Sequence, residues 1–357
     1  MCPIKLSALL RKYKMPILTF KPKIITRQLV SCLKDRTKDI VVQRYGLAED
    51  ADKKTLEAIG DKYGITRERI RQITNFAFNL MKESQAFESA QDIFSEMKDS
   101  IERKGKILSE RDALAHLAGN DPLAQNHIYF LLVLGDDFTK IKEDDEFHHR
   151  WTIHLEHADK VHQALRALHN EISEDDLVLE KDLISALKKH SEKIAGESVD
   201  SDIVRTWLNL SKRLGQNAMG EWGQASSPSI KPRGVRDLAY LVLRKEGSPM
   251  HFAEVAQKIS SYFGKPANSA TVHNELIKDG RFVLVGRGLY ALSDWGYKYG
   301  TVRDIIKYII KSEGPSSKED IVKKVLKERY VKENTILVNL QNRDYFKRNK
   351  EGQYLVG

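Results

Sequence analysis

The sequence of 357 residues has few cysteines and no long apolar run. Its two cysteines, Cys2 and Cys32, are too few for a disulfide framework or a zinc site. The longest unbroken apolar run, residues 128–134, is far shorter than the roughly 20 residues that a membrane-spanning helix needs. The opening segment, MCPIKLSALLRKYK, lacks the apolar core and the cleavage site of a secretory signal. We therefore expect a cytoplasmic protein with no membrane partner.

Motifs of common enzyme chemistry are missing as well. The sequence has no GxxxxGK[ST] phosphate loop, no GxSxG elbow and no recognisable nuclease core of strand-borne acids with a lysine. Four histidines cluster in a spacing that fits no common zinc pattern: His148, His149, His154 and His157. The acidic run 143–146 fits a solvated hairpin turn. We expect no catalytic residues, no metal and no cofactor, and a protein that is not an enzyme.

Charge is distributed unevenly along the chain. Residues 1–85 carry 18 Lys and Arg against 9 Asp and Glu, a net charge of +9. Residues 86–227 carry 17 against 27, a net charge of −10, and residues 228–357 carry 24 against 14, a net charge of +10. Basic ends favour contact with a polyanion, whereas the acidic middle suits a spacer or a basic protein surface.

Helical periodicity dominates, and short β segments follow every third helix. Residues 235–292 contain three amphipathic helices, with Ser269 as an N-cap and Gly280 as a stop, and then a hairpin around residues 286–288. This order is the winged-helix plan. It returns in the following segment, where Ser316 and Glu319 have the spacing of a capping box, and more loosely in residues 88–153 and 156–225.

The predicted fold is mostly α, with tandem helix-turn-helix and winged-helix modules and short β-hairpin wings. The Ser- and Pro-rich segment 224–234 is the clearest linker. The predicted segments are a basic N-terminal arm (1–27), a helix-turn-helix (28–85), a winged-helix-like unit (86–155), a degenerate winged-helix-like unit with the linker (156–227), a winged helix (228–297) and a C-terminal winged helix (298–357).

The segment 64–73, GITRERIRQI, places a helix rich in arginine directly after a glycine turn. On a helical wheel, an inward face collects Ile70, Ile73, Ala77, Leu80 and Met81. The outward face collects Glu68, Arg71, Gln72, Asn75 and Asn79, with Arg67 and Arg69 on its flanks. Arg, Gln, Asn and Glu are the side chains that pair with base edges in the major groove, which admits an α-helix. A solvated helix surface is the alternative.

Residues 28–83, with KTLEAIGDKYGITRERIRQI at their centre, strongly resemble region four of housekeeping-type bacterial sigma factors. The resemblance implies a helix-turn-helix that reads a promoter element in double-stranded DNA and docks on the flap of the RNA polymerase β subunit. By matching positions it implies base contacts at Arg67, Glu68, Arg71 and Gln72, and supporting or phosphate contacts at Thr66 and Arg69.

The sequence departs from that family in two respects. TNFAFNLMK replaces the usual basic tail, so we expect Phe76 and Phe78 to pack against the next module. No segment resembles the aromatic-rich sigma region that melts promoter DNA, which argues against a complete initiating sigma factor.

Residues 234–297 resemble a second family, the HARE-type winged helix, which is found in the delta subunit of bacterial RNA polymerase, in chromatin-associated proteins and beside restriction endonucleases. The resemblance implies a role with nucleic acid or polymerase. Candidate contacts are His273, Asn274 and Lys278 on its third helix and Arg287 at its wing tip. Arg233, in the preceding KPRG, is a candidate for insertion into a narrow minor groove.

We therefore expect a nucleoid-associated, sequence-specific regulator that contacts RNA polymerase core. The main alternative is a polymerase accessory or scaffold subunit in which the same modules bind protein. The apolar helix at 122–134 favours that alternative, because it is a poor groove reader. A nuclease-linked defence component is a third possibility.

Overall fold

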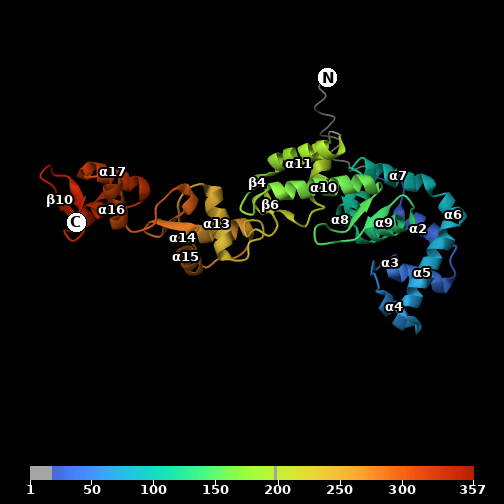
Figure 1. Cartoon of the computed structure of the whole chain (residues 1–357). Coiled ribbons are helices and arrows are strands. Elements are labelled where there is room, and N and C mark those ends of the chain that lie inside the picture. Colours follow the sequence, from blue (N-terminus) through green and yellow to red (C-terminus); the bar gives the residue numbers. More distant parts are fainter. Residues whose placement is uncertain (1–17, 197–198) are drawn as a thin grey trace, which may run out of the picture. The chain divides into compact units, whose positions relative to one another are not determined.

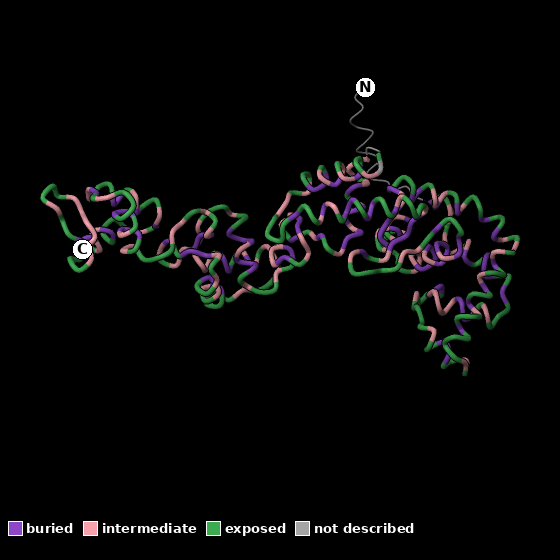
Figure 2. The backbone as a smooth tube through the Cα atoms, viewed as in Figure 1, coloured by how far each residue is buried: buried purple, intermediate pink, exposed green. Residues whose placement is uncertain are grey.

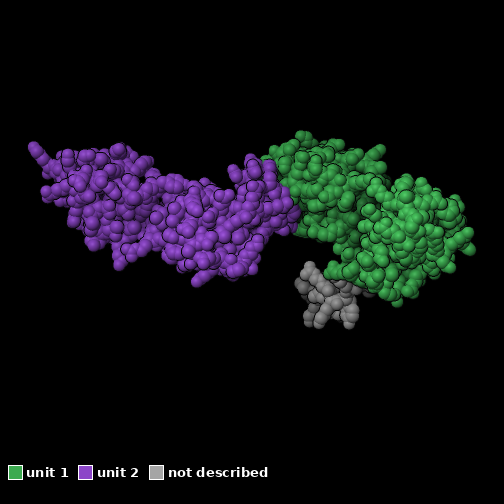
Figure 3. All heavy atoms as spheres, turned by 90° about the horizontal axis from the view of Figure 1, so that it is seen from below, with its two compact units in different colours: residues 1–172, 181–214 green, residues 173–180, 215–357 purple. Residues whose placement is uncertain are grey.

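The computed structural model describes residues 18–196 and 199–357 and is mostly α-helical, as predicted. Most of the predicted N-terminal arm lies outside the described residues. The chain divides into two compact units (Figure 3). The first runs to Ile172 and resumes over Lys181–Leu214; the second comprises Ser173–Glu180 and Gly215–Gly357. No helix in the described part of the chain is long and apolar enough to cross a membrane.

The first unit begins with a group of helices that includes a helix-turn-helix (Figure 1). These helices are α2 (Pro22–Val30), α3 (Asp35–Tyr45), α4 (Leu56–Tyr63), α5 (Arg67–Lys82) and the short α6 (Gln85–Glu88). Helix α2 starts before the predicted boundary at residue 28, with Pro22 at the position where a missing N–H costs least.

Two repeats of three helices and a small sheet follow. The first consists of α7 (Gln91–Glu102), β1 (Ile107–Ser109), α8 (Glu110–Ala118), α9 (Pro122–Leu134), β2 (Thr139–Ile141) and β3 (Arg150–Thr152). The second consists of α10 (Leu155–Glu171), β4 (Val178–Leu179), α11 (Glu180–Ala195), α12 (Ser201–Leu208), β5 (Leu214–Gln216) and β6 (Glu221–Gln224). Helix α12 is shorter than predicted, and the expected poor second strand is the well-formed β6.

The second unit contains strands β4 and β6 of the second repeat and two complete repeats. One consists of α13 (Val235–Glu246), β7 (Met250–His251), α14 (Phe252–Phe263), α15 (Ser269–Lys278), β8 (Phe282–Gly286), β9 (Leu289–Leu292) and the 3-10 turn η1 (Ser293–Trp295). The other consists of α16 (Val302–Glu313), α17 (Lys318–Glu328), α18 (Glu333–Leu340), β10 (Phe346–Arg348) and β11 (Tyr354–Val356).

Each sheet is antiparallel, and three of them contain a strand that the sequence did not predict. Their orders are β1-β3-β2, β4-β6-β5 and β7-β9-β8, so the short strand after the first helix pairs with the second strand of the hairpin. In the last repeat an isolated bridge between Ser316 and Tyr354 occupies the equivalent place. These strands have two or three residues, too few for a periodic pattern.

Two predicted helix caps are wrong by one residue. Asn268, not Ser269, caps α15, because its side chain accepts hydrogen bonds from Ala270 N and Thr271 N. Ser317, not Ser316, caps α17 through the backbone N–H of Asp320. Gly280 does not end α15, whose C-cap is Asp279.

The predicted linker 224–234 is partly packed rather than free. Ser227 and Ile230 are buried, and Asn217 donates a side-chain hydrogen bond to Ser229 O. A Cβ on Gly223 would come 3.2 Å from the Ile230 side chain, so glycine lets this segment approach β6 closely. Composition marked the segment as irregular, but did not reveal the packing of its isoleucine.

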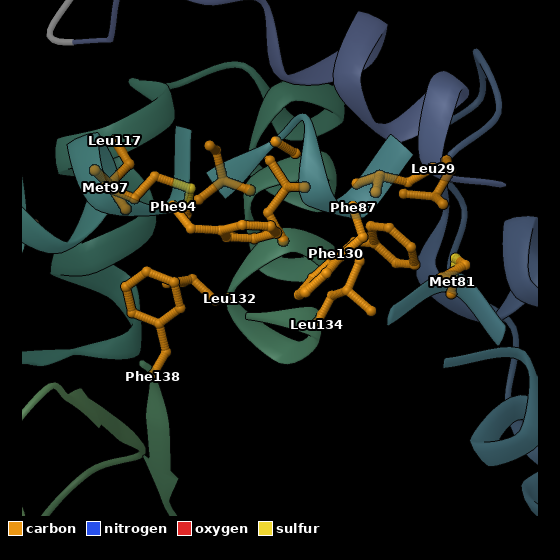
Figure 4. Packing of buried hydrophobic residues seen from close by; sticks show 14 of the residues in the cluster. Leu29, Met81, Phe87, Phe94, Met97, Leu117, Phe130, Leu132, Leu134 and Phe138 are labelled. Atoms are coloured by element: carbon orange, nitrogen blue, oxygen red, sulfur yellow. The ribbon is translucent and has the colours of Figure 1, made fainter. Parts of the chain in front are cut away.

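The larger core described in the first unit joins the N-terminal helices to the first repeat. It contains Leu29 of α2, Met81 of α5 and Phe130 of α9 (Figure 4), and also Val41 of α3. In the second unit each repeat has a core of its own. Figure 2 shows buried and exposed stretches alternating along the chain, as expected of helices that bury one side.

Candidate nucleic-acid interface

The turn between α4 and α5 is built by two glycines and one capping threonine. Gly64 ends α4 in the left-handed region with φ +64°, a conformation that glycine adopts without strain. Gly60 lies where a Cβ would come 2.5 Å from Ile65 O, so the turn closes tightly over it. The Thr66 side chain accepts a hydrogen bond from Arg69 N at 3.2 Å and begins α5. The predicted supporting residue Thr66 is thus the N-cap.

A small core orients α5. Ile40, Ile59 and Ile70, from three helices, are fully buried against one another. Of the predicted inward face, Ile70, Ala77 and Met81 are buried and Ile73 is half-buried. Leu80, however, is exposed. Thr74, which was not predicted to point inward, is buried, and its hydroxyl donates to Ile70 O at 2.9 Å. The buried stripe therefore follows positions 70, 74, 77 and 81.

All seven predicted contact residues of this motif are exposed on one module. They are Thr66, Arg67, Glu68, Arg69, Arg71, Gln72 and Asn75. Because the small isoleucine core holds the opposite side of α5, these side chains face away from the protein. The surface that they form, called the α5 outer face below, begins in the first turn of the helix, where a helix that enters the major groove presents its readers.

Side chains of the α5 outer face pair with one another. Glu68 accepts two hydrogen bonds from Arg71, from Nε at 2.9 Å and from Nη2 at 2.7 Å. Arg69 donates from Nη1 to Gln72 Oε1 at 3.1 Å. The hydrogen bonds from Arg71 lower the pKa of Glu68. An exposed ion pair of this kind is weak, so Arg71 can exchange Glu68 for a base or a phosphate at little cost.

The two phenylalanines that replace the basic tail behave differently. Phe78 packs as predicted, with its ring centroid 5.6 Å from Tyr45 and 5.5 Å from Phe130 of α9. Phe76 does not: its side chain is 60% exposed. The predicted packing of Phe76 is therefore wrong, because it lies one position before the buried Ala77.

Helix α9, the third helix of the first repeat, is covered by the N-terminal helices. Asn126 is buried and donates from Nδ2 to Gly46 O and to Ala51 O, both at 2.9 Å. Gly46 needs its φ of +61°, and a Cβ there would come 2.7 Å from Asn126 Nδ2. The prediction that α9 is a poor groove reader agrees with this burial, since the apolar side of α9 packs against α2, α3 and the end of α5.

The third helices of the other repeats differ in accessibility. Helix α12 packs against the first repeat through Trp207, whose side chain is buried and donates from Nε1 to Gly105 O at 3.1 Å. Helices α15 and α18 carry exposed residues along one side. These are Ala270, Thr271, Asn274, Ile277 and Lys278 on α15, and Asn334, Thr335, Val338, Gln341 and Asn342 on or just after α18.

Four of the five secondary DNA-binding candidates are exposed, and one is half-buried. Asn274 and Lys278 are exposed on α15, and Arg287 is exposed at the tip of the β8–β9 hairpin. His273 is half-buried and stacks on Phe252 at 4.3 Å, so its ring is already occupied. Arg233 is exposed, and its backbone N–H donates to Asp237 at 3.0 Å.

The acidic run 143–146 is more structured than predicted. Asp144 accepts hydrogen bonds from Glu146 N, Phe147 N and the side chain of buried Arg150. Burial raises the pKa of Asp144, but these hydrogen bonds outweigh it and lower the pKa overall. Arg150 also donates to His162 at 2.8 Å. Within the described ranges, no group of three or more His, Cys, Asp or Glu side chains is placed to hold a metal ion.

Sequence comparison identifies both DNA-binding-type modules. Residues 29–83 match the family described as Sigma-70, region 4. Residues 234–295 match HARE-HTH, a helix-turn-helix family whose description names ASXL and the restriction endonuclease HTH domain. The chain thus carries a sigma region 4 module followed by a HARE-HTH module, which confirms both predicted resemblances.

Similar curated proteins include the RNA polymerase principal sigma factor HrdD of Streptomyces griseus, 46% identical over 54 residues, which is 15% of this chain and 16% of the relative. The RNA polymerase sigma factor RpoD of two Helicobacter pylori strains is 40% identical over 53 residues, 15% of this chain and 8% of the relative. The chain therefore matches less than a fifth of the length of these relatives. The matches support a DNA-binding, transcription-related protein.

Proposed function

We propose that this protein is a sequence-specific DNA-binding regulator of bacterial transcription that reads a promoter element through the α5 outer face. The observation that carries the proposal is the exposure of all seven predicted contact residues on a capped helix of a sigma region 4 module. Arg71 and Gln72 are then base readers, and Thr66 and Arg69 hold the helix on the phosphate backbone.

The chemistry of the α5 outer face favours duplex DNA over other polyanions. Arg67, Arg69 and Arg71 supply positive charge, while Glu68, Gln72 and Asn75 add acceptors and amides that a phosphate surface alone does not need. A mixed set of this kind discriminates between bases. The role is binding, without catalysis, so duplex DNA incubated with the protein and Mg²⁺ or Mn²⁺ is expected to remain intact. Cleavage would instead favour the nuclease-linked alternative.

The second part of the proposal is a contact with RNA polymerase core, in the cytoplasm and on the nucleoid. The sigma resemblance names the flap of the β subunit as the docking surface. In this chain α9 covers the apolar sides of α2, α3 and the end of α5, so a polymerase contact uses what remains exposed on the module or displaces α9. The acidic segment 86–227 is a second candidate for a basic polymerase surface.

The alternative is a polymerase accessory subunit that does not read sequence. The burial of α9, and of Trp207 on α12, favours it, because these contacts use the third helices for internal packing. Under this alternative the exposed helices bind protein and DNA contact is incidental.

Selection of duplexes from a random pool by the full-length protein separates the two functions. The pool is selected once with the protein alone and once with RNA polymerase core added. Enrichment of a defined motif by the protein alone is the expected result. Co-purification with polymerase that survives nuclease treatment, without enrichment of any motif, would establish the accessory role instead.

A further inference from the structure

The last repeat, residues 298–357, lies outside both matched family segments and carries a surplus of positive charge. It contains 14 Lys and Arg against 8 Asp and Glu, a net charge of +6. Its core of isoleucine and valine is its own, and it holds α18 and the β10–β11 hairpin together. Part of this positive charge is gathered on one surface of the repeat.

Three exposed cations line a cleft between the end of α18 and the hairpin. The cleft has a volume of about 800 Å³, and Arg343, Lys347, Arg348, Gln341 and Tyr354 contribute to its lining. Across residues 199–357, all of which the structure describes, no carboxylate lies within 4.0 Å of the charged nitrogens of these three cations. Asp344 and Glu351 are the acids nearest in sequence, and both are exposed. The three cations of the cleft are therefore not held in direct ion pairs within these described residues.

Aromatic rings lie against Arg348 and against two cations of the adjoining helix. Arg348 lies over the ring of Tyr354 at 4.8 Å. On the adjoining helix α16, Arg303 and Lys307 lie over Tyr345 at 4.3 Å and 4.5 Å. A cation on a ring face is held in place but keeps its charge available to an anion. We call the set Arg343, Lys347 and Arg348 the wing cations.

Helix α18 offers an uncovered side next to the wing cations. Asn334, Thr335 and Val338 are exposed, with Val338 at 59%, and Gln341 and Asn342 continue the same side. Neutral amides and a hydroxyl with one branched apolar residue are suited to base edges and to a thymine methyl group. In the first repeat the equivalent helix, α9, is buried.

We propose that the last repeat is a second site for double-stranded DNA, in which α18 enters the major groove and the wing cations bind the flanking phosphates. The positive charge of the site favours a polyanion as its ligand. An α-helix with polar side chains fits the major groove of B-form DNA, whereas the major groove of an RNA duplex is too narrow for side chains to read. This site extends the proposed function but does not depend on base reading by α5.

The test compares three full-length proteins on a random-sequence duplex by fluorescence anisotropy over a range of salt concentrations. One is unchanged, and one carries Arg343→Ala, Lys347→Ala and Arg348→Ala. The control carries Lys311→Ala, Lys323→Ala and Lys327→Ala, which removes the same charge from exposed positions on α16 and α17. Loss of three phosphate contacts lowers the slope of log affinity against log salt by about 2 to 3. We expect this drop for the wing variant only.

Equal losses in the wing and control variants would overturn the proposal, because net charge alone would then explain binding. No loss in either would overturn it too, as would tighter binding of a single strand or of anionic vesicles than of the duplex through the wing cations. Val338→Glu, which places a carboxylate on the uncovered side of α18, is expected to weaken duplex binding while circular dichroism shows intact helices. A further protein combines Arg71→Ala with the three wing substitutions. The wing substitutions are expected to lower the salt slope by the same amount with or without Arg71, so a failure of this site can be told apart from a failure of the α5 outer face.

Discussion

The partner of Arg71 in the structure differs from its partner in the proposed complex. In the structure both Nε and Nη2 donate to Glu68, whereas the proposed complex needs two of its donors on a base. Both side chains are about half exposed, so the exchange exposes no apolar surface.

Replacement of Arg71 by alanine tests this role. On a duplex selected by the intact protein, Arg71→Ala is expected to weaken binding by about tenfold to a hundredfold and to relax preference at one base pair. Arg103→Ala, which removes the same charge from an exposed position after α7, is the control. Anisotropy on selected and scrambled duplexes provides the measurement. Equal losses on both duplexes would make Arg71 a phosphate contact.

His162 makes the first unit sensitive to acid. Its ring accepts the hydrogen bond from Arg150, and burial together with the charges of Arg150 and Arg166 lowers its pKa from 6.5 to about 4. The folded protein thus favours neutral His162, while the unfolded chain takes up a proton below pH 6.5. Stability is complete above pH 6.5 and is lost as the pH falls toward 4, by roughly 3 kcal/mol.

Urea unfolding between pH 7 and pH 4 measures this dependence. His162→Gln keeps an acceptor for Arg150 but does not titrate, so its stability is expected to change less over the same window. Carboxylates with lowered pKa values, such as Glu143 and Asp144, also lose their contribution to stability as the pH falls, but they are present in both proteins and affect them alike. Identical pH profiles for the two proteins would show that His162 does not control the acid response.

At the scale of elements, much of the architecture was predictable because helices have a local sequence pattern. The apolar periodicity of residues 302–313 or 252–263 and the flanking glycines placed those helices closely. The hairpin around Gly288 followed in the same way. The extra strand in three of the sheets did not, since residues such as Met250 and His251 become a strand only by pairing with a distant segment.

The candidate site shows the same division. The exposed residues of α5 could be listed from the wheel, because one face had to pack inward. The elements that pack against that face could not be predicted, because periodicity reveals the apolar side of a helix but not the partner that covers it. The cover provided by α9, and the polar anchor of Asn126, depend on residues about 80 positions apart. Gly60 was missed because its need for a bare Cα comes from the approach of Ile65.

Asn126 is expected to anchor the sigma-like helices on α9. Asn126→Ala leaves the carbonyls of Gly46 and Ala51 without this donor, so we expect a loss of roughly 1 to 3 kcal/mol in unfolding free energy. Gln125→Ala, at a half-buried neighbour on the same helix, serves as the control and is expected to cost less. Hydrogen exchange should locate the loss at the end of α3. If exchange there is unchanged, another contact provides the anchor.

At the scale of the whole molecule, the repeats divide between structural and presenting roles. In the first unit α9 and Trp207 of α12 are buried in packing, and the sigma region 4 segment, residues 29–83, presents α5. In the second unit α15 and α18 keep an exposed side. The charge pattern follows the same division, with net positive charge in the sigma-like and C-terminal segments and net negative charge in the repeats between them.

The central claim is that the α5 outer face enters a DNA groove. Photo-cross-linking tests it most directly, with a photoreactive amino acid replacing Gln72 in the full-length protein bound to its selected duplex. The matched control places the same group at Glu102, an exposed position at the end of α7. We predict adducts on bases inside the selected motif from position 72 and none from position 102. Adducts confined to position 102, or absent from position 72 while the duplex is bound, would contradict the account.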